Sequence, residues 1–550
     1  MTSGFQLNRR TLVGGIGSAI AAPHVARGAA ATEYVEIATV EGRLRGLRDN
    51  GVSVFKGVRY AAPLTPAQRF RAPARLQSWT GMRDALGYGA PSIQAGGNAN
   101  LGGIEPSEDC LFLNIWTPAT GADGRKRPVM YYLHGGGFVI GSGAARGQDG
   151  ANLARNNDVV VIQTNHRLGL LGFLWLGDLL GPDYATSGNQ CLFDITEGLE
   201  WTRRNVEAFG GDPSNVMVWG ESGGGAKTSA IYGFNPAAPL FHKASIESGP
   251  GIRMTERDQA AATARHVLGE LGIAPADARR LLEVPAAQLL AIQTKGAVAA
   301  GPAAAGPPLG GMGSGALNTY GPVVDGTHLP AHPFDPTAPA ISADKPLIVG
   351  GNKDEATFFL RTAPDKDEVF SLDEAGLRRR VARQYGEENA DRLLAAYRRD
   401  MPGATAPQLA VAIQSDTFSR IGSDYIADKK YAQRRAPVYL YRLTGGMVAP
   451  VEGTNYPAGA SHALDISLKF DNVANRPAEP DGGAALRATA KNMSRYWAAF
   501  ARSSVPSAEG QPTWPAFDSV RRPMMLLQPQ CEVVFDQYPN IRSFWSSMMA

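Results

Sequence analysis

Two kinds of hydrophobic pattern alternate along this chain. Residues 35–48 switch between apolar and polar positions, reach a turn signal at 49–51 (Asp-Asn-Gly), and continue into an apolar run at 52–58. Such a pattern predicts an antiparallel hairpin near the N-terminus. Short apolar runs of strand length follow at residues 108–116, 129–133, 159–162, 216–219, 244–247, 347–349 and 438–443.

Between these runs, apolar residues recur at helical spacing. Residues 196–209 and 486–502 each carry an apolar face, and we expect Trp497 and Phe500 to lie on the buried side of the second helix. Strands that alternate with helices predict an α/β fold: a large, mostly parallel central sheet with helices on both faces and a small N-terminal antiparallel hairpin.

The remaining stretches do not divide the chain into separate units. Residues 296–315 are rich in Gly, Ala and Pro and predict a long surface loop, since strands resume after them. Residues 373–436 are charged and helical, and we expect them to form a lateral cap packed on the sheet. We therefore expect residues 32–550 to form one domain.

Composition excludes several classes of function. The chain has 550 residues, is 44% hydrophobic, and carries 54 basic and 51 acidic residues. No basic block with interleaved aromatic residues is present, so a nucleic-acid partner is not expected. The three cysteines, Cys110, Cys191 and Cys531, are far apart, which argues against a disulfide framework and a cysteine-based zinc site.

The first 31 residues have the pattern of an export signal. Arg9 and Arg10 precede the apolar stretch 12–22, and the alanines at 29–31 offer a cleavage site. The apolar stretch is too short to span a bilayer, which needs about 20 residues. This arrangement resembles a bacterial twin-arginine signal, with a Sec signal or a basic tail as the alternatives.

Such a signal predicts a location in the periplasm or outside the cell, and makes the twin-arginine export machinery a partner of the precursor. A lipid anchor is not expected, because no cysteine precedes Cys110. We therefore predict no stable membrane anchor.

The most informative local pattern is residues 220–224, Gly-Glu-Ser-Gly-Gly, which directly follow the apolar run 216–219. G-x-S-x-G after a strand is typical of a sharp strand-to-helix turn that exposes a nucleophilic serine, here Ser222. The glycines are required because a Cβ beside the serine would strike the neighbouring backbone. The alternative is a glycine-rich turn beside a core strand.

A nucleophilic serine needs a histidine base and a carboxylate that orients it, in the chain order Ser, acid, His. Five histidines follow Ser222: His242, His266, His328, His332 and His462. Only His462 comes after the strand predicted at 347–349, in a loop after the strand at 438–443. We expect His462 to be the base, with a structural histidine as the alternative.

The acid is expected on a loop at the carboxyl end of a strand between Ser222 and His462. Asp354 and Glu355 both follow the strand at 347–349, and their spacing does not choose between them. Both could instead be a solvated pair on a loop.

An oxyanion hole needs backbone N–H groups directed at the developing negative charge. Gly223 follows the nucleophile, and His134-Gly135-Gly136-Gly137 follows the strand at 129–133 in the HGGG form. A phosphate-binding loop is the rival interpretation, but the Lys-Ser/Thr of a Walker motif is missing.

With these motifs in place, residues 34–546 closely resemble the type B carboxylesterase/lipase family of α/β hydrolases, which includes cholinesterases and fungal lipases. The resemblance rests on ordered motifs at residues 108–118 (EDCLFLNIWTP), 134–138 (HGGGF), 165–173 (NHRLGLLGF), 209–224, 322–326, 351–355 and 459–462.

This resemblance implies roles that spacing leaves open. The family uses a glutamate as its acid, which selects Glu355 over Asp354. It places the oxyanion donors at Gly136 and Gly137, together with Gly223.

The resemblance also implies that Ser248 and Glu221 support the triad from beside it. It implies no metal and no organic cofactor.

The chain departs from the family in three places. The cysteine that often pairs with the one in the E-D-C motif is replaced by Ser92, so Cys110 is expected to be a buried free thiol. His166 replaces a common tyrosine, and Cys191 replaces a glycine.

Together these features predict a serine carboxylic ester hydrolase that forms an acyl-enzyme on Ser222. The stretch from Ser92 to Asp109 contains no aromatic residue to hold a quaternary ammonium group, so we expect a small, neutral ester substrate. The alternatives are the same triad acting on carbamates, amides or long-chain lipid esters, or a cholinesterase-like binding module without catalysis.

Overall fold

The computed structural model describes residues 33–96, 101, 103–145, 147–299, 320–473, 479 and 483–549. The predicted export signal at residues 1–31 lies outside the described residues. Most of the predicted glycine-rich loop also lies outside them, from residue 300 onwards. The part of that loop that is described differs from the prediction, because residues 296–299 belong to helix α7.

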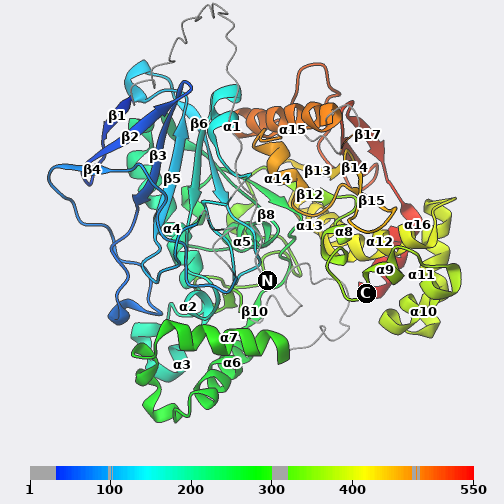
Figure 1. Cartoon of the computed structure of the whole chain (residues 1–550), viewed down its shortest axis with the longest axis horizontal. Coiled ribbons are helices and arrows are strands. Elements are labelled where there is room, and N and C mark those ends of the chain that lie inside the picture. Colours follow the sequence, from blue (N-terminus) through cyan, green and yellow to red (C-terminus); the bar gives the residue numbers. More distant parts are fainter. Residues whose placement is uncertain are drawn as a thin grey trace, which may run out of the picture.

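A 13-stranded sheet runs through the molecule (Figure 1). Its order is β1-β2-β3-β5-β7-β6-β8-β9-β12-β13-β16-β17, with β4 beside β2. The strands are parallel from β7 to β16 and antiparallel toward both ends, as predicted for a mostly parallel α/β sheet. They are β1 (Tyr34–Ala38), β2 (Arg43–Asp49), β3 (Val52–Arg59), β4 (Met82–Asp84), β5 (Phe112–Thr117), β6 (Arg127–Leu133), β7 (Val160–Thr164), β8 (Gly211–Glu221), β9 (Lys243–Glu247), β12 (Leu347–Asn352), β13 (Val438–Leu443), β16 (Pro523–Leu527) and β17 (Glu532–Phe535).

The N-terminal hairpin is larger than predicted. Residues 35–48 form two strands, because the chain turns back where Thr39 Oγ1 and the Thr39 backbone N–H both donate to the carbonyl of Gly42. Together with β3, they form a three-stranded antiparallel unit. Four short strands lie off the main sheet, β10 (Thr255–Glu256) with β11 (Val323–Val324), and β14 (Met447–Pro450) with β15 (Pro457–Gly459).

Helices cover both faces of the sheet (Figure 1). Val216 and Val218 of β8 belong to the hydrophobic cluster that includes α4 and α5, whereas Met217 and Trp219 belong to the cluster that includes α14 and α15. This alternation follows from the two-residue period of a strand. The helices are α1 (Ala151–Asn157), α2 (Gly169–Phe173), α3 (Gly177–Leu180), α4 (Gln190–Asn205), α5 (Gly223–Tyr232), α6 (Arg257–Glu270), α7 (Ala286–Ala299), α8 (Ala356–Leu360), α9 (Lys366–Val369), α10 (Glu374–Tyr385), α11 (Glu387–Asp400), α12 (Ala406–Ser415), α13 (Ile421–Ala432), α14 (Leu464–Lys469), α15 (Ala484–Ser503) and α16 (Pro539–Met549).

The region predicted as a lateral cap divides into two parts. Helix α13 packs on the sheet against β12 and β13, as expected. Helices α10, α11 and α12 instead share a separate hydrophobic cluster with the C-terminal helix α16, through residues such as Leu393 and Trp545. These three helices stand to one side of the sheet (Figure 1). On the predicted late helix, now α15, Trp497 and Phe500 are fully buried as expected.

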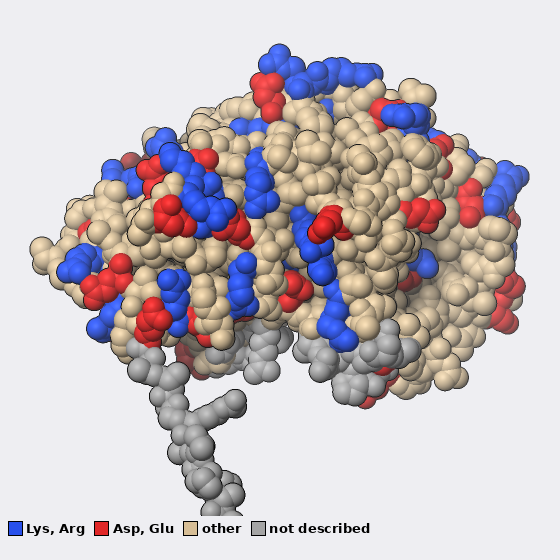
Figure 2. Space-filling model, turned by 90° about the horizontal axis from the view of Figure 1, so that it is seen from above, with Lys and Arg blue, Asp and Glu red and all other residues tan. Residues whose placement is uncertain are grey.

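Acidic and basic side chains are interspersed on the face seen in Figure 2, so the coloured residues there present no broad field of one sign. None of the helices in the described part of the chain is long and apolar enough to cross a membrane.

Candidate active site

Ser222 stands at the turn between β8 and α5. Its backbone has φ +60° and ψ −124°, and its N–H donates to the carbonyl of Glu247 at 2.9 Å. A Cβ on Gly220 would come within 2.6 Å of the Leu133 carbonyl oxygen, and one on Gly224 within 2.0 Å of the same oxygen. The turn therefore requires glycine on both sides of the serine, for the steric reason that the sequence indicated.

Ser222, His462 and Glu355 lie in one chain of hydrogen bonds. His462 Nε2 lies 2.9 Å from Ser222 Oγ, and His462 Nδ1 lies 2.7 Å from Glu355 Oε2. Glu355 follows β12, and its other oxygen accepts the N–H of Asn352 at 2.7 Å. All three side chains are buried. This arrangement suits proton transfer from a serine hydroxyl to an imidazole held in one orientation by a carboxylate.

Asp354, the neighbour that spacing left open as the acid, has a different environment. Its Oδ2 accepts the N–H of Ala460 at 2.9 Å and so ties the loop that precedes His462 to the end of β12. The structure therefore brings Glu355, and not Asp354, onto the imidazole.

The glycine-rich loop after β6 lies against the nucleophile turn. Gly136 and Gly137 have φ +89° and +62°, values that favour glycine. A Cβ on Gly223 would lie 2.4 Å from the Gly137 nitrogen, so these two predicted donors are adjacent. Among the described residues, the N–H groups of Gly136, Gly137 and Gly223 have no recorded acceptor. They are thus available to an oxyanion next to Ser222.

Glu221 adds a second carboxylate to the imidazole. Its Oε1 lies 3.3 Å from His462 Nδ1, and the side chain is buried. Burial is the largest effect on the pKa of Glu221; although the charge of His462 opposes it, burial together with the charges of Asp465 and Glu355 raises this pKa to about 8. Burial lowers the pKa of His462, but Glu221 and Glu355 outweigh it, so the pKa of His462 is raised.

Comparisons with known proteins identify the family of this chain. The model of the carboxylesterase family matches residues 31–545. The chain belongs to the carboxylesterase family. Its relatives include the para-nitrobenzyl esterase of Bacillus subtilis, 30% identical over 91% of this chain and 96% of the relative. The phenmedipham hydrolase of Pseudarthrobacter oxydans is 32% identical over 87% of this chain and 92% of the relative.

Among solved structures, the carboxylesterase Est55 of Geobacillus stearothermophilus matches with a TM-score of 0.76 and 34% identity, over 93% of this chain and 99% of that chain. This confirms the predicted family and its α/β-hydrolase fold. It also confirms the predicted enzyme class, a hydrolase of the carboxylesterase family.

Next to the hydrogen-bonded chain of Ser222, His462 and Glu355 lies a buried ionic cluster that the sequence did not reveal. Lys469 on α14 is fully buried, contacts Glu247, and donates to Asp465 Oδ2 at 2.6 Å. Asp465 Oδ1 accepts from Asn352 Nδ2 at 3.2 Å, and the same amide donates to the Ser461 carbonyl at 2.9 Å. The cluster therefore joins β9, β12 and the loop that carries His462.

The sequence analysis also did not predict a wall of aromatic side chains beside the imidazole of His462. Phe358 and Phe359 come from α8, which begins directly after Glu355, and Phe418 comes from the π-helical segment Asp416–Arg420 between α12 and α13. Their ring centroids lie 5.6, 5.0 and 4.9 Å from that of His462. The pair of phenylalanines just after the acid was the available signal, but Phe418 is too distant in sequence to be placed beside them.

Two of the three departures from the family pattern contact each other. His166 Nδ1 lies 3.3 Å from Cys191 Sγ, and the His166 ring stacks on His134 with centroids 4.5 Å apart. Lys227 of α5, also fully buried, donates to the His134 carbonyl at 2.9 Å. Burial lowers the pKa of Lys227 to about 8. These residues form a continuous polar layer under the glycine-rich loop.

The remaining departure is Ser92, which stands where the family often has the cysteine that pairs with Cys110. Cys110 is a buried free cysteine, as expected; burial raises the pKa of its thiol, and the nearby Ser92 side chain opposes part of that shift. Ser248, expected to support the triad, follows the residue whose carbonyl binds the Ser222 N–H. Its hydroxyl is buried, and no hydrogen-bond partner for it is recorded among the described residues. A supporting role for Ser248 stays a prediction.

Two of the histidines rejected as the base have other partners. His242 Nδ1 accepts the N–H of Val216 at 3.1 Å, and His328 Nδ1 lies 2.9 Å from Asp325. Within the described part of the chain, no three His, Cys, Asp or Glu side chains are grouped as a metal site would need.

Proposed function

We propose that this carboxylesterase hydrolyses carboxylic esters through an acyl-enzyme on Ser222. The observation that carries the proposal is the hydrogen-bonded chain from Ser222 Oγ through His462 to Glu355. Family membership supports the same reaction class.

In the first half of the proposed reaction, Ser222 Oγ attacks the ester carbonyl carbon while its proton passes to His462 Nε2. His462 then gives that proton to the departing alcohol. In the second half, a water molecule loses a proton to His462 and attacks the acyl carbon, which releases the carboxylate and restores Ser222. Glu355 holds the imidazole and stabilises its protonated form.

The N–H groups of Gly136, Gly137 and Gly223 are proposed to donate hydrogen bonds to the carbonyl oxygen as it becomes negatively charged in both halves. Removal of one such donor in a serine hydrolase costs about 10²–10³ in kcat. Their proximity to the nucleophile turn and their lack of a recorded acceptor among the described residues support this role.

Labelling with an organophosphate, followed by peptide mapping, tests the nucleophile. We expect one adduct, on Ser222, and none on a Ser222→Ala variant with the same thermal unfolding temperature. A stable adduct elsewhere, with hydrolysis retained in Ser222→Ala, would overturn the proposal.

The bond that is cleaved requires its own test. A relative that is 32% identical bears the name phenmedipham hydrolase, and phenmedipham is a carbamate. The second candidate is therefore the same triad acting on carbamates. p-Nitrophenyl esters of increasing acyl length, measured beside p-nitrophenyl carbamates and anilides, rank these candidates by kcat/KM, and we expect the short neutral esters to lead.

We further propose that the protein is exported by the twin-arginine route to the periplasm or beyond. The support is the arginine pair before a short apolar stretch in the sequence. Replacement of Arg9 and Arg10 by lysine should leave the enzyme in the cytoplasm with its signal uncut, since lysine lacks the guanidinium group. Undiminished periplasmic activity would indicate Sec export instead.

A further inference from the structure

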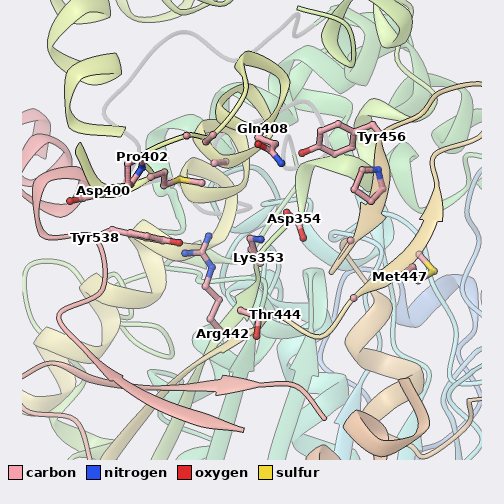
Figure 3. Close-up of a pocket in the computed structure, with 17 residues that line it drawn as sticks. Lys353, Asp354, Asp400, Pro402, Gln408, Arg442, Thr444, Met447, Tyr456 and Tyr538 are labelled. Atoms are coloured by element: carbon pink, nitrogen blue, oxygen red, sulfur yellow. The ribbon is translucent and has the colours of Figure 1, made fainter. Parts of the chain in front are cut away.

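A cavity of about 530 Å³ lies at the carboxyl ends of β12 and β13, and neither Ser222 nor His462 is among the residues that line it. Its wall is built by β12, β13, the loop between α11 and α12, and the β14–β15 hairpin. Figure 3 shows the side chains that line it. It is thus separate from the proposed triad, although both lie at the same edge of the sheet.

The polar centre of this cavity is Arg442. Its side chain is only 6% exposed, and its Nη2 donates to Asp416 Oδ1 at 3.3 Å. Its Nε and Nη1 atoms are buried and have no hydrogen-bond partner among the described residues. Nε carries one N–H and Nη1 carries two, so three charged donors lack an acceptor. Buried donors left in this state are costly, and an acceptor in the cavity that Arg442 lines would remove this cost once the side chain turns toward it.

Asp416 does not neutralise this guanidinium fully, because it is already paired. Arg420 donates to both of its oxygens at 2.7 Å, and Tyr397 donates to Oδ2 at 2.7 Å. Arg442 is therefore a second cation beside one carboxylate. Figure 3 draws its guanidinium between the Tyr538 ring and Lys353. Lys353 is exposed and has no ion-pair partner among the described residues.

Two carboxylates belong to the wall of the cavity, Asp354 and Asp400, and both accept hydrogen bonds from groups other than Arg442 and Lys353. Asp354 Oδ2 accepts the N–H of Ala460 at 2.9 Å. Asp400 accepts from Asn540 Nδ2 at 2.7 Å and from the Ile541 N–H at 2.8 Å. The cations of the wall, Lys353 and Arg442, thus have hydrogen-bonding capacity left for an occupant.

The wall also contains apolar side chains, beside the polar groups of Gln408, Thr444 and Tyr538. The apolar part is formed by Met401, Pro402, Met447, Pro457 and the ring of Tyr456. A ligand that suits both parts has an anionic head and an apolar body. A free inorganic anion would satisfy only the cations.

We propose that this cavity is a second binding site, which takes a small organic carboxylate with its carboxyl group on Arg442 and Lys353 and its apolar body against the methionines and Tyr456. Guanidinium groups bind carboxylates strongly because both are planar and the hydrogen bonds are charge-assisted. Carboxylates are what ester hydrolysis releases, so the choice of ligand class rests on the proposed function, whereas the cation-lined cavity does not.

Equilibrium binding to the Ser222→Ala protein tests the site without depending on turnover, so failure of the proposed esterase activity would leave the test intact. The probes are benzoate, its neutral isostere benzamide, and inorganic phosphate, measured by titration calorimetry. We expect benzoate to bind saturably and at least about tenfold more tightly than benzamide or phosphate, since only benzoate combines a charged carboxylate with an apolar ring.

Variants locate the binding. Arg442→Lys keeps the charge but removes the planar donors, and Lys353→Gln removes an exposed charge, so each should weaken benzoate binding, the first by about tenfold or more. Arg435→Gln is the matched control, because Arg435 is an exposed arginine paired with Asp344, which is not among the lining residues. It should bind benzoate unchanged.

A crystal soaked with 4-bromobenzoate gives the position directly. An anomalous bromine peak in the cavity, with the carboxylate on Arg442, is the expected result. A peak only beside residue 222, unchanged affinity in both Arg442→Lys and Lys353→Gln, or phosphate binding as tight as benzoate binding would each overturn the proposal. If Arg442→Lys unfolds, Lys353→Gln and the soaked crystal still decide it.

Discussion

Glu221 Oε1 lies 3.3 Å from His462 Nδ1, the same ring nitrogen that Glu355 Oε2 contacts at 2.7 Å. The imidazole is thus bordered by two buried carboxylates, and both raise its pKa. A raised pKa has a direct kinetic consequence, because His462 accepts the serine proton only when it is neutral.

The first prediction concerns the pH profile of Glu221→Gln. Activity of the parent is lost as the pH falls through the raised pKa of His462. Removal of one carboxylate lowers that pKa, so the acid limb of kcat/KM should move to lower pH. The measurement is kcat/KM for p-nitrophenyl acetate across the acid limb, with Glu270→Gln on the surface of α6 as the control. An acid limb that stays in place would show that Glu221 carries no charge while His462 titrates.

The second prediction separates the two neighbouring carboxylates. His462→Ala should be as damaging as Ser222→Ala, and Glu355→Gln should lower kcat somewhat less, by up to about 10⁴-fold, because the imidazole persists in a poorer orientation. Asp354→Asn should be mild, since an amide oxygen can still accept the Ala460 N–H. Stopped-assay kinetics at matched expression measure these effects. A lower kcat in Asp354→Asn than in Glu355→Gln would show that Asp354, and not Glu355, is the acid.

The third prediction concerns the buried lysine. Lys469→Met should leave Glu247 and Asp465 without their shared cation and destabilise the fold by about 3–5 kcal/mol. Urea unfolding measures this loss. The double variant Lys469→Met/Glu247→Gln removes one stranded charge and should recover part of the stability. A single variant within about 1 kcal/mol of the parent would contradict the view that these carboxylates depend on Lys469.

The fourth prediction uses the contact between Ser92 and Cys110. Ser92→Cys should form a disulfide under oxidising conditions and reduce the number of titratable thiols in the unfolded chain from four to two, given the three native cysteines. Closure of a loop of this size stabilises a fold by about 3 kcal/mol. Urea unfolding with and without reductant measures the gain. Four free thiols after oxidation would show that the two side chains do not reach disulfide geometry.

The fifth prediction concerns substrate charge. The described part of the stretch from Ser92 to Asp109 contributes no aromatic side chain that could hold a quaternary ammonium group, and residues 97–100 and 102 within it lie outside the described residues. We expect acetylcholine and its neutral isostere 3,3-dimethylbutyl acetate to have kcat/KM values within about tenfold, or 1.4 kcal/mol. A larger preference for acetylcholine would indicate an aromatic cage elsewhere.

The sequence was sufficient for the residues whose chain order carries meaning. Ser222 could be located because G-x-S-x-G demands a preceding strand, and His462 because it follows the strand after the acid. The choice of Glu355 over Asp354 required more than spacing, because adjacent residues differ only in direction, and direction depends on how the chain leaves β12. The family resemblance supplied that choice.

What the sequence did not reveal depends on contacts between distant segments. Lys469 looks like a surface residue of a short helix until β9 and β12 are placed above it. Phe418 joins the aromatic wall only because the π-helical segment after α12 packs beside the residues that follow the acid. The charged, helical pattern of residues 373–436 indicated a cap packed on the sheet, and nothing in it indicated that α10 to α12 would share a separate hydrophobic cluster with α16.

The three cysteines, Cys110, Cys191 and Cys531, are all buried and free. The covalent structure of this protein is therefore the same in a reducing compartment as in an oxidising one, because no disulfide has to form before the fold is complete. A chain that folds before crossing a membrane and a chain that folds afterwards would arrive at the same enzyme. Recovery of full activity after refolding in the presence of a reductant is the behaviour this composition implies.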